Sequence, residues 1–260
     1  MKHLTRLSTL AAFSFLLGCA VVPETGRRQI MLVSPQQEME MGLASFAQVK
    51  EQERVSKDPA YNAQVERLGR RIAAAVGREL PNAQWEFVVF ESDQVNAFAL
   101  PGGKVGVYTG LLKLASSDDE VACVVGHEIA HVTSRHGGER VSQQMAAGLV
   151  GAVGAVALDD NKYRDVILAG YGLGATGTIL AYSRSHETEA DSIGLRFAAG
   201  AGYDPRAAVT FWQKMAAKNQ GKEPPKWLST HPPSAERIAK LQRLAPEYMA
   251  LYEQSRRRFE

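Results

Sequence analysis

Hydrophobic residues recur at intervals of three or four along most of this chain, which is the spacing of one face of an α-helix. Four such stripes are clear: Met39, Leu43, Phe46 and Val49; then Val65, Leu68, Ile72 and Val76; then Val121, Val124, Val125, Ile129 and Val132; and finally Val209, Phe211, Trp212 and Met215. Each stripe follows a residue whose side chain can accept hydrogen bonds from the first free N–H groups of a helix, namely Ser34, Asp58, Ser117 or Asp204. The pattern predicts a mainly helical protein.

The pattern changes to that of β-strands in one central region. Gln84–Phe90 is a short hydrophobic run, and Pro101-Gly102-Gly103 is a turn between two more hydrophobic segments, which predicts a hairpin. A chain of 260 residues that is 45% hydrophobic can bury a full core. We therefore expect one α+β domain, mainly α-helical, over residues 34–250.

The first residues have the character of a targeting segment. Lys2 and Arg6 precede an apolar run, Leu7–Leu17, which is too short to span a membrane. Gly18 and Cys19 follow it and resemble a bacterial lipobox. We expect residues 1–18 to be a lipoprotein signal peptide, Cys19 to carry lipid, and residues 19–33 to be a tether. An ordinary cleaved signal peptide is the alternative.

Two further features follow from this expectation. Ala20 implies no inner-membrane retention signal, so the resemblance implies the periplasmic face of the outer membrane. Cys123 then has no partner for a disulfide and is expected to be a small buried hydrophobe.

The formal net charge is +2, from 30 basic and 28 acidic residues. Loss of Lys2 and Arg6 leaves a neutral chain, which offers no electrostatic case for nucleic acid.

The stripe at 121–132 contains the sequence His127-Glu128-Ile129-Ala130-His131. Two histidines four apart share one helical face, where both imidazoles can bind one metal ion. Glu128 is rotated off that face and suits a second task, which is to accept a proton from a metal-bound water molecule. The alternative is a chance match, which the capped and hydrophobic helix context makes less frequent.

This motif, following Asn96–Gly103 (NAFALPGG), resembles the M48 metallopeptidases. The resemblance covers about Pro35 to Leu244 and implies a gluzincin-type zinc protease domain with a small β-sheet beside the HExxH helix. It also implies a third zinc ligand within an ExxxD pattern on a later helix, which Glu187 and Asp191 match. Asp191 would accept a hydrogen bond from a ligand histidine, His127. A surface charge is the alternative for Glu187.

The rival metzincin pattern does not fit, because it needs glycine at 134 and histidine at 137, where this chain has Ser134 and Gly137. The loop His231-Pro232-Pro233 is also similar to M48 enzymes. The resemblance implies that His231 approaches the metal, either as a fourth ligand or as a donor to an oxyanion. It implies that Arg237 holds an oxyanion or a carboxylate. A hydrogen-bonding loop and a surface salt bridge are the alternatives.

The function implied is that of a zinc-dependent endopeptidase of the bacterial envelope, with one Zn²⁺ per chain. Its substrates would be unfolded or misassembled envelope proteins, and their extended segments would pair with the strand edge at Asn96, Ala97 and Phe98. A structural hairpin without substrate contact is the alternative for these residues. An assembly partner in the envelope is a further expectation from the resemblance.

A second class of function is a zinc-braced periplasmic chaperone or assembly factor with latent protease activity, in which His231 is a permanent fourth ligand. Glu128 argues against it, because a structural site needs no base. Met145–Leu158 and Val166–Tyr182 are rich in small and apolar residues, and we expect two helices over the active site that form a lid or rest on the bilayer. Residues 251–260, with three successive arginines, are expected to be a solvated tail or short helix.

Overall fold

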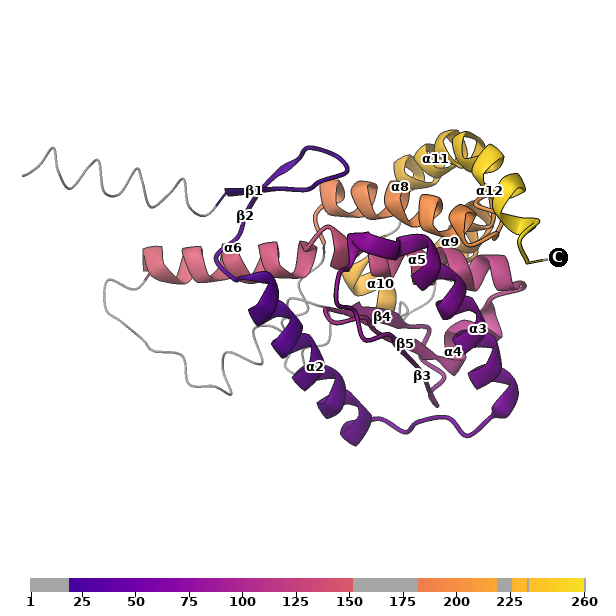
Figure 1. Ribbon diagram of the computed structural model, residues 1–260, viewed down its shortest axis with the longest axis horizontal. Coiled ribbons are helices and arrows are strands. Elements are labelled where there is room, and N and C mark those ends of the chain that lie inside the picture. Colours follow the sequence, from indigo (N-terminus) through magenta and orange to yellow (C-terminus); the bar gives the residue numbers. More distant parts are fainter. Residues whose placement is uncertain (1–18, 152–181, 219–225, 233, 260) are drawn as a thin grey trace, which may run out of the picture.

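A computed structural model of the chain describes residues 19–151, 182–218, 226–232 and 234–259 (Figure 1). Its helices are α2 Pro35–Gln52, α3 Pro59–Val76, α4 Thr109–Leu114, α5 Asp118–Thr133, α6 His136–Gly151, α8 Arg184–Gly200, α9 Ala207–Lys218, α10 Lys226–Thr230, α11 Ala235–Leu244 and α12 Met249–Arg256. Its strands are β1 Cys19–Val21, β2 Arg28–Ile30, β3 Glu86–Phe90, β4 Ala97–Leu100 and β5 Lys104–Tyr108. The expected α+β, mainly helical class is confirmed.

The expected helices around residues 145–182 fall largely outside the described residues. Only the first of them begins within this part of the chain, where α6 already starts at His136. This helix extends away from the body of the domain (Figure 1).

The sheet beside the main helices has the order β3-β5-β4. β4 and β5 form the predicted antiparallel hairpin, and its turn contains Gly102 and Gly103 at φ +87° and +79°, values that favour glycine. β3 pairs with β5 in parallel, so the order of the strands in space differs from their order in the chain. β4 is left at one edge of the sheet.

Helix α5 lies at the centre of the domain, where it contacts both β4 and α8. The Ser117 hydroxyl accepts a hydrogen bond from the Glu120 N–H, as the sequence predicts, but the Glu120 carboxylate accepts from the N–H of Ser116 rather than that of Ser117. Every residue from 120 to 132 is buried. Cys123 is among them and is a free thiol, as expected.

Helices α5 and α8 cross with their backbones in contact. A Cβ atom on Gly194 would lie 2.8 Å from the Cα of His127, and a Cβ on Gly126 would lie 2.8 Å from the carbonyl oxygen of Gly194. Distances this short exclude any side chain at the crossing. The two glycines therefore bring α8 next to the HExxH sequence of α5.

The expected tether at residues 19–33 is instead an ordered hairpin. β1 and β2 pair in antiparallel fashion, Val22, Met31 and Val33 are buried, and Arg27 forms an ion pair with Glu189 of α8. The turn and charge character of this segment suggested a flexible leash, but its alternating hydrophobic residues find a partner surface on the domain.

The C-terminal residues pack on the domain as well. α12 contacts α8, and the Arg71 guanidinium lies 3.8 Å from the centroid of the Phe259 ring. The expected short helix is present, although Ser255 is buried within it. In the described ranges of the chain, no helix is long and apolar enough to cross a membrane.

Candidate active site

Four buried side chains from three parts of the chain converge at one point: His127, His131, Glu187 and His231. One potential ligand atom from each lies within 4.8 Å of all the others. The Nε2 atoms of His127 and His131 are 3.1 Å apart, and His231 Nδ1 lies 2.9 Å from Glu187 Oε1. The structure thus brings together the three residues expected to bind a metal, and adds His231 as the fourth.

Glu128 lies beside this cluster with its carboxylate held in place by a tryptophan. The Trp227 indole N–H donates a hydrogen bond of 2.6 Å to Glu128 Oε1, and the Trp227 ring stacks on Trp212. His231 Nε2 is 3.5 Å from the same carboxylate oxygen. Trp227 was missed in the sequence, because a lone tryptophan in a short helix gives no signal of this role.

Asp191 lies where the sequence places it. Its Oδ1 is 3.1 Å from His127 Nδ1, so the carboxylate can accept the ring N–H and leave Nε2 directed at the cluster. Arg237 donates to both oxygens of Asp191, at 2.6 and 2.7 Å, and also forms an ion pair with Glu187. Arg237 is therefore buried among the carboxylates of the site, not at a surface salt bridge.

The charges of this group explain its protonation. Burial alone raises the pKa of Glu187, but the Arg237 charge and hydrogen bonds from His231 and His131 hold it well below its usual value. Burial lowers the pKa of His131 well below its usual value. The glutamate is therefore ionised and this histidine is neutral, which are the forms that bind metal ions.

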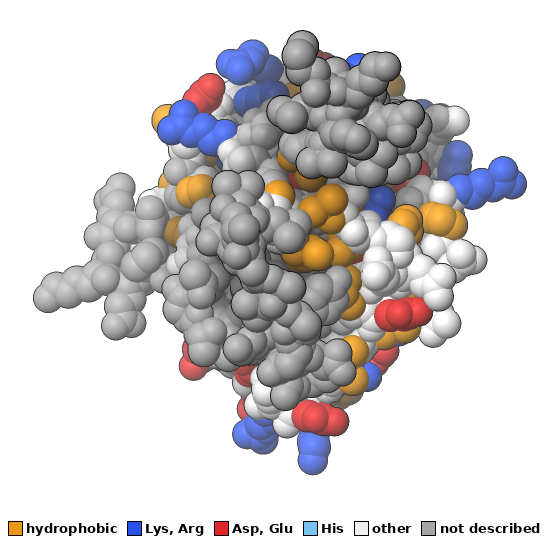
Figure 2. All heavy atoms as spheres, turned by 90° about the vertical axis from the view of Figure 1, so that its left-hand side faces the viewer, with side chains coloured by type: hydrophobic (Ala, Val, Ile, Leu, Met, Phe, Trp, Pro, Cys, Tyr) orange, Lys and Arg blue, Asp and Glu red, His pale blue; other side chains and the backbone are white. Residues whose placement is uncertain are grey.

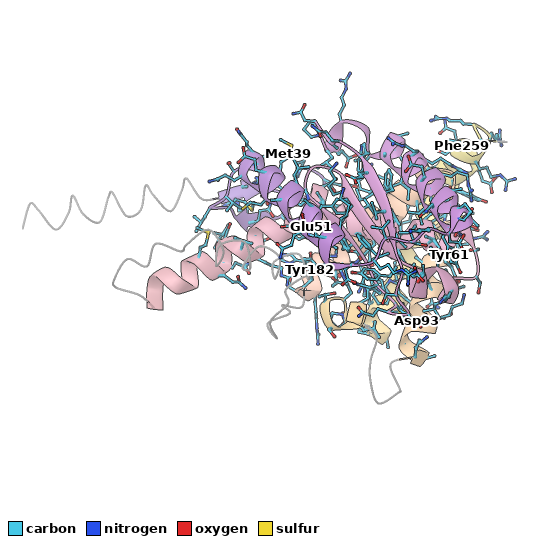
Figure 3. All side chains as sticks on the ribbon, turned by 90° about the horizontal axis from the view of Figure 1, so that it is seen from below. Met39, Glu51, Tyr61, Asp93, Tyr182 and Phe259 are labelled. Atoms are coloured by element: carbon cyan, nitrogen blue, oxygen red, sulfur yellow. The ribbon has the colours of Figure 1, made fainter. Side chains whose placement is uncertain are left out.

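His131 has neighbours that the sequence did not suggest. Tyr182, labelled in Figure 3, stacks on its ring with 3.8 Å between centroids. His131 Nδ1 lies 2.8 Å from His136 Nδ1, and His136 Nε2 lies 2.8 Å from Glu189 Oε2. Glu189 points away from the cluster, as its helical position predicts, yet it reaches His131 through this histidine.

The residues expected to contact substrate, Asn96, Ala97 and Phe98, are buried. The Phe98 side chain packs against Phe46 and Phe90 in the core. Any contact of this strand with a peptide would therefore be made by its backbone. β4 is an edge strand beside α5, so the predicted pairing with a peptide is compatible with its place in the sheet and stays a prediction.

Comparison with known proteins agrees with this geometry. Residues 59–245 match the sequence family described as peptidase family M48. The chain is 35% identical over 230 residues to mitochondrial metalloendopeptidase OMA1 of Schizosaccharomyces pombe, which covers 87% of this chain and 66% of that protein. It is 32% identical over 218 residues to the beta-barrel assembly-enhancing protease of Yersinia pestis, covering 82% of this chain and 44% of that one.

The beta-barrel assembly-enhancing protease of Escherichia coli is 29% identical over 240 residues, which cover 90% of this chain and 49% of that protein. The chain therefore spans about two thirds of the length of the fission yeast relative and less than half of that of the two bacterial ones. The matched family covers most of the chain, including the HExxH sequence and all the buried residues of the site. The chain belongs to peptidase family M48.

Proposed function

We propose that this chain is a zinc-dependent endopeptidase of the bacterial cell envelope, which cleaves misfolded or misassembled envelope proteins. The observation that carries the proposal is the convergence of His127, His131 and Glu187 beside Glu128, all of them buried. Relatives named metalloendopeptidase and beta-barrel assembly-enhancing protease support the same activity.

The donor set fits a zinc ion. Imidazole nitrogens and a carboxylate are common ligands of Zn²⁺. Burial alone raises the pKa values of Glu187 and Asp191, but the Arg237 charge lowers both, so these two carboxylates are ionised. Glu187 and Asp191 share the single positive charge of Arg237, so a cation would balance the remaining negative charge. His127, His131 and Glu187 would hold the ion, which would lower the pKa of a water molecule and polarise the scissile carbonyl.

The residues of the chain then divide the remaining work. Glu128 accepts the proton of the attacking water and passes it to the leaving amine. Trp227 keeps the Glu128 carboxylate in one position through its N–H. Asp191 fixes the tautomer of His127, and Arg237 holds Asp191 and Glu187. Arg237 is therefore proposed as a positioning residue instead of a group that touches the substrate.

The location in the envelope rests on the N-terminal residues. Cys19 follows a lipobox-like sequence, and its register partner in the hairpin is Ile30. Val21, Ile30 and Leu32 are exposed hydrophobic residues of this segment. Figure 2 shows the side of the molecule towards which α6 extends in Figure 1, and hydrophobic side chains of described residues are exposed on it. A lipid on Cys19 would place this segment at the membrane.

One observation favours a second function. His231 completes a set of four protein side chains, and closed four-ligand zinc sites are usually structural. A chaperone or assembly factor of the envelope that uses zinc only to stabilise its fold would need these four ligands and no catalytic base. Against this, Glu128 and its tryptophan partner would have no task in such a site.

The test is degradation of unfolded casein by the purified protein with zinc, comparing wild type with Glu128→Gln and His231→Ala. Cleavage by wild type and none by Glu128→Gln, with zinc bound to both, supports the protease. Faster cleavage by His231→Ala would make His231 an inhibitory fourth ligand, and loss of cleavage would make it a participant in the reaction. Zinc binding without cleavage by any of the three refutes a general protease and favours the scaffold.

A further inference from the structure

His131, His136 and Glu189 form a row of hydrogen bonds, in which Glu189 decides which atom donates and which accepts. His136 lies between His131 and Glu189, with its Nδ1 towards one and its Nε2 towards the other. Its side chain is fully buried. A carboxylate that forms an ion pair with a guanidinium, as Glu189 does with Arg27, only accepts hydrogen bonds, so His136 donates to it from Nε2.

This position of the proton decides the tautomer of His131. With Nε2 protonated, His136 Nδ1 has a lone pair and can only accept, so His131 must donate from its own Nδ1. His131 Nε2 then carries the lone pair, and this is the atom that lies 3.1 Å from His127 Nε2 and 3.3 Å from Glu187 Oε1. The opposite arrangement would put a proton on His131 Nε2 and leave a lone pair facing Glu189.

Glu189 is itself held by the N-terminal hairpin. Arg27 Nε donates to its Oε2 at 2.8 Å, and the Thr25 hydroxyl donates to its Oε1. The Arg27 guanidinium and the Thr25 hydroxyl, both in the segment that follows Cys19, thus hold Glu189 as a hydrogen-bond acceptor.

We propose that His136 and Glu189 are positioning residues for His131, which keep its Nε2 free for zinc, and that the N-terminal hairpin secures this chain through Arg27 and Thr25. The inference rests on the proposed zinc site. Each histidine of the HExxH motif is then oriented by a different carboxylate of α8. Asp191 accepts from His127 directly, whereas Glu189 acts on His131 through His136.

The test measures zinc affinity of the purified protein by competition with a chromogenic chelator. Glu189→Gln keeps the shape of the side chain, but its amide can donate to His136 Nε2 and so permits the wrong tautomer. We expect zinc binding weaker by about 10–100-fold. Nitrogen-15 NMR of the metal-free protein should show part of the His131 proton moving from Nδ1 to Nε2.

Glu139→Gln is the matched control. Glu139 is buried to the same degree as Glu189 and also pairs with Arg27, but its histidine neighbour is His186, at 3.0 Å, and not His136. Its zinc affinity should stay within about threefold of wild type, since the amide leaves the His131 chain intact. Should Glu189→Gln fail to fold, His136→Phe gives the same test, because it removes the acceptor for His131 Nδ1.

The inference is overturned if Glu189→Gln binds zinc as tightly as the wild type. If Glu189→Gln does not fold, unchanged zinc affinity in His136→Phe overturns it instead. Equal losses in Glu189→Gln and Glu139→Gln also overturn it, because a general effect of buried charge would then suffice. Failure of the wild type to bind zinc would refute the proposed function itself, so the two failures are distinguishable.

Discussion

Arg237 offers the most direct test of the electrostatics of this site. Its guanidinium is buried, donates to both oxygens of Asp191 at 2.6 and 2.7 Å, and forms an ion pair with Glu187. In Arg237→Gln, Glu187 keeps its contacts with His131 and His231, whereas Asp191 keeps the contact with His127. The variant would leave two buried carboxylates without a counter-charge.

Breaking a buried ion pair by removing one partner costs about 3–5 kcal/mol. We expect the metal-free Arg237→Gln protein to lose this much free energy of unfolding, measured by urea denaturation followed through tryptophan fluorescence. Saturating zinc should reduce the loss, because the cation supplies positive charge beside Glu187. Burial alone raises the pKa values of Asp191 and Glu187, but the Arg237 charge keeps both below their usual values. This is the shift expected if the guanidinium stabilises the ionised carboxylates.

Arg206→Gln is the control, since Arg206 also donates to both carboxylate oxygens of one aspartate, Asp204. The Arg206 side chain is 63% exposed, and surface ion pairs contribute about 0–1 kcal/mol. A loss below about 1 kcal/mol in Arg237→Gln, or equal losses in the two variants, would refute the argument that burial makes the Arg237 contacts strong.

Three further predictions follow from single contacts. Trp227→Phe removes the N–H that donates to Glu128, so kcat on casein should fall on the order of tenfold with little change in KM; an unchanged kcat would contradict the role given to this tryptophan. Gly194→Ala places a methyl group 2.8 Å from the His127 backbone, so α8 must move and zinc affinity should drop by at least about tenfold. Gly200→Ala is the control: its methyl group would lie 3.3 Å from its nearest neighbour, and it should bind zinc like the wild type. The folded-state pKa of Glu189 is lowered from 4.5 to about 2, so its carboxylate contributes stability above pH 4.5 that is lost as the pH falls towards 2; in urea denaturation, Glu189→Gln should lose less stability than wild type across this window, and parallel curves would contradict the shift.

The sequence by itself determined the local features of this protein. The periodic hydrophobic positions and the caps at Ser34, Asp58 and Ser117 predict three of the helices, which begin at the next residue in each case. The spacing of His127 and His131 places both on one face of a helix. Such features depend on residues a few positions apart, where backbone hydrogen bonding and helical geometry act directly. The roles of Glu187, His231 and Arg237 came from the resemblance to the M48 family.

Only the tertiary structure decided which distant residues meet. The contact of Trp227 with Glu128 joins residues 99 positions apart, that of Glu189 with His136 joins residues 53 apart, and that of Arg27 with Glu189 joins residues 162 apart. The parallel pairing of β3 with β5 and the docking of the N-terminal hairpin are of the same kind. No local periodicity encodes such contacts, because they depend on how α5 and α8 approach through Gly126 and Gly194 and on which buried polar groups need a partner once the core has closed.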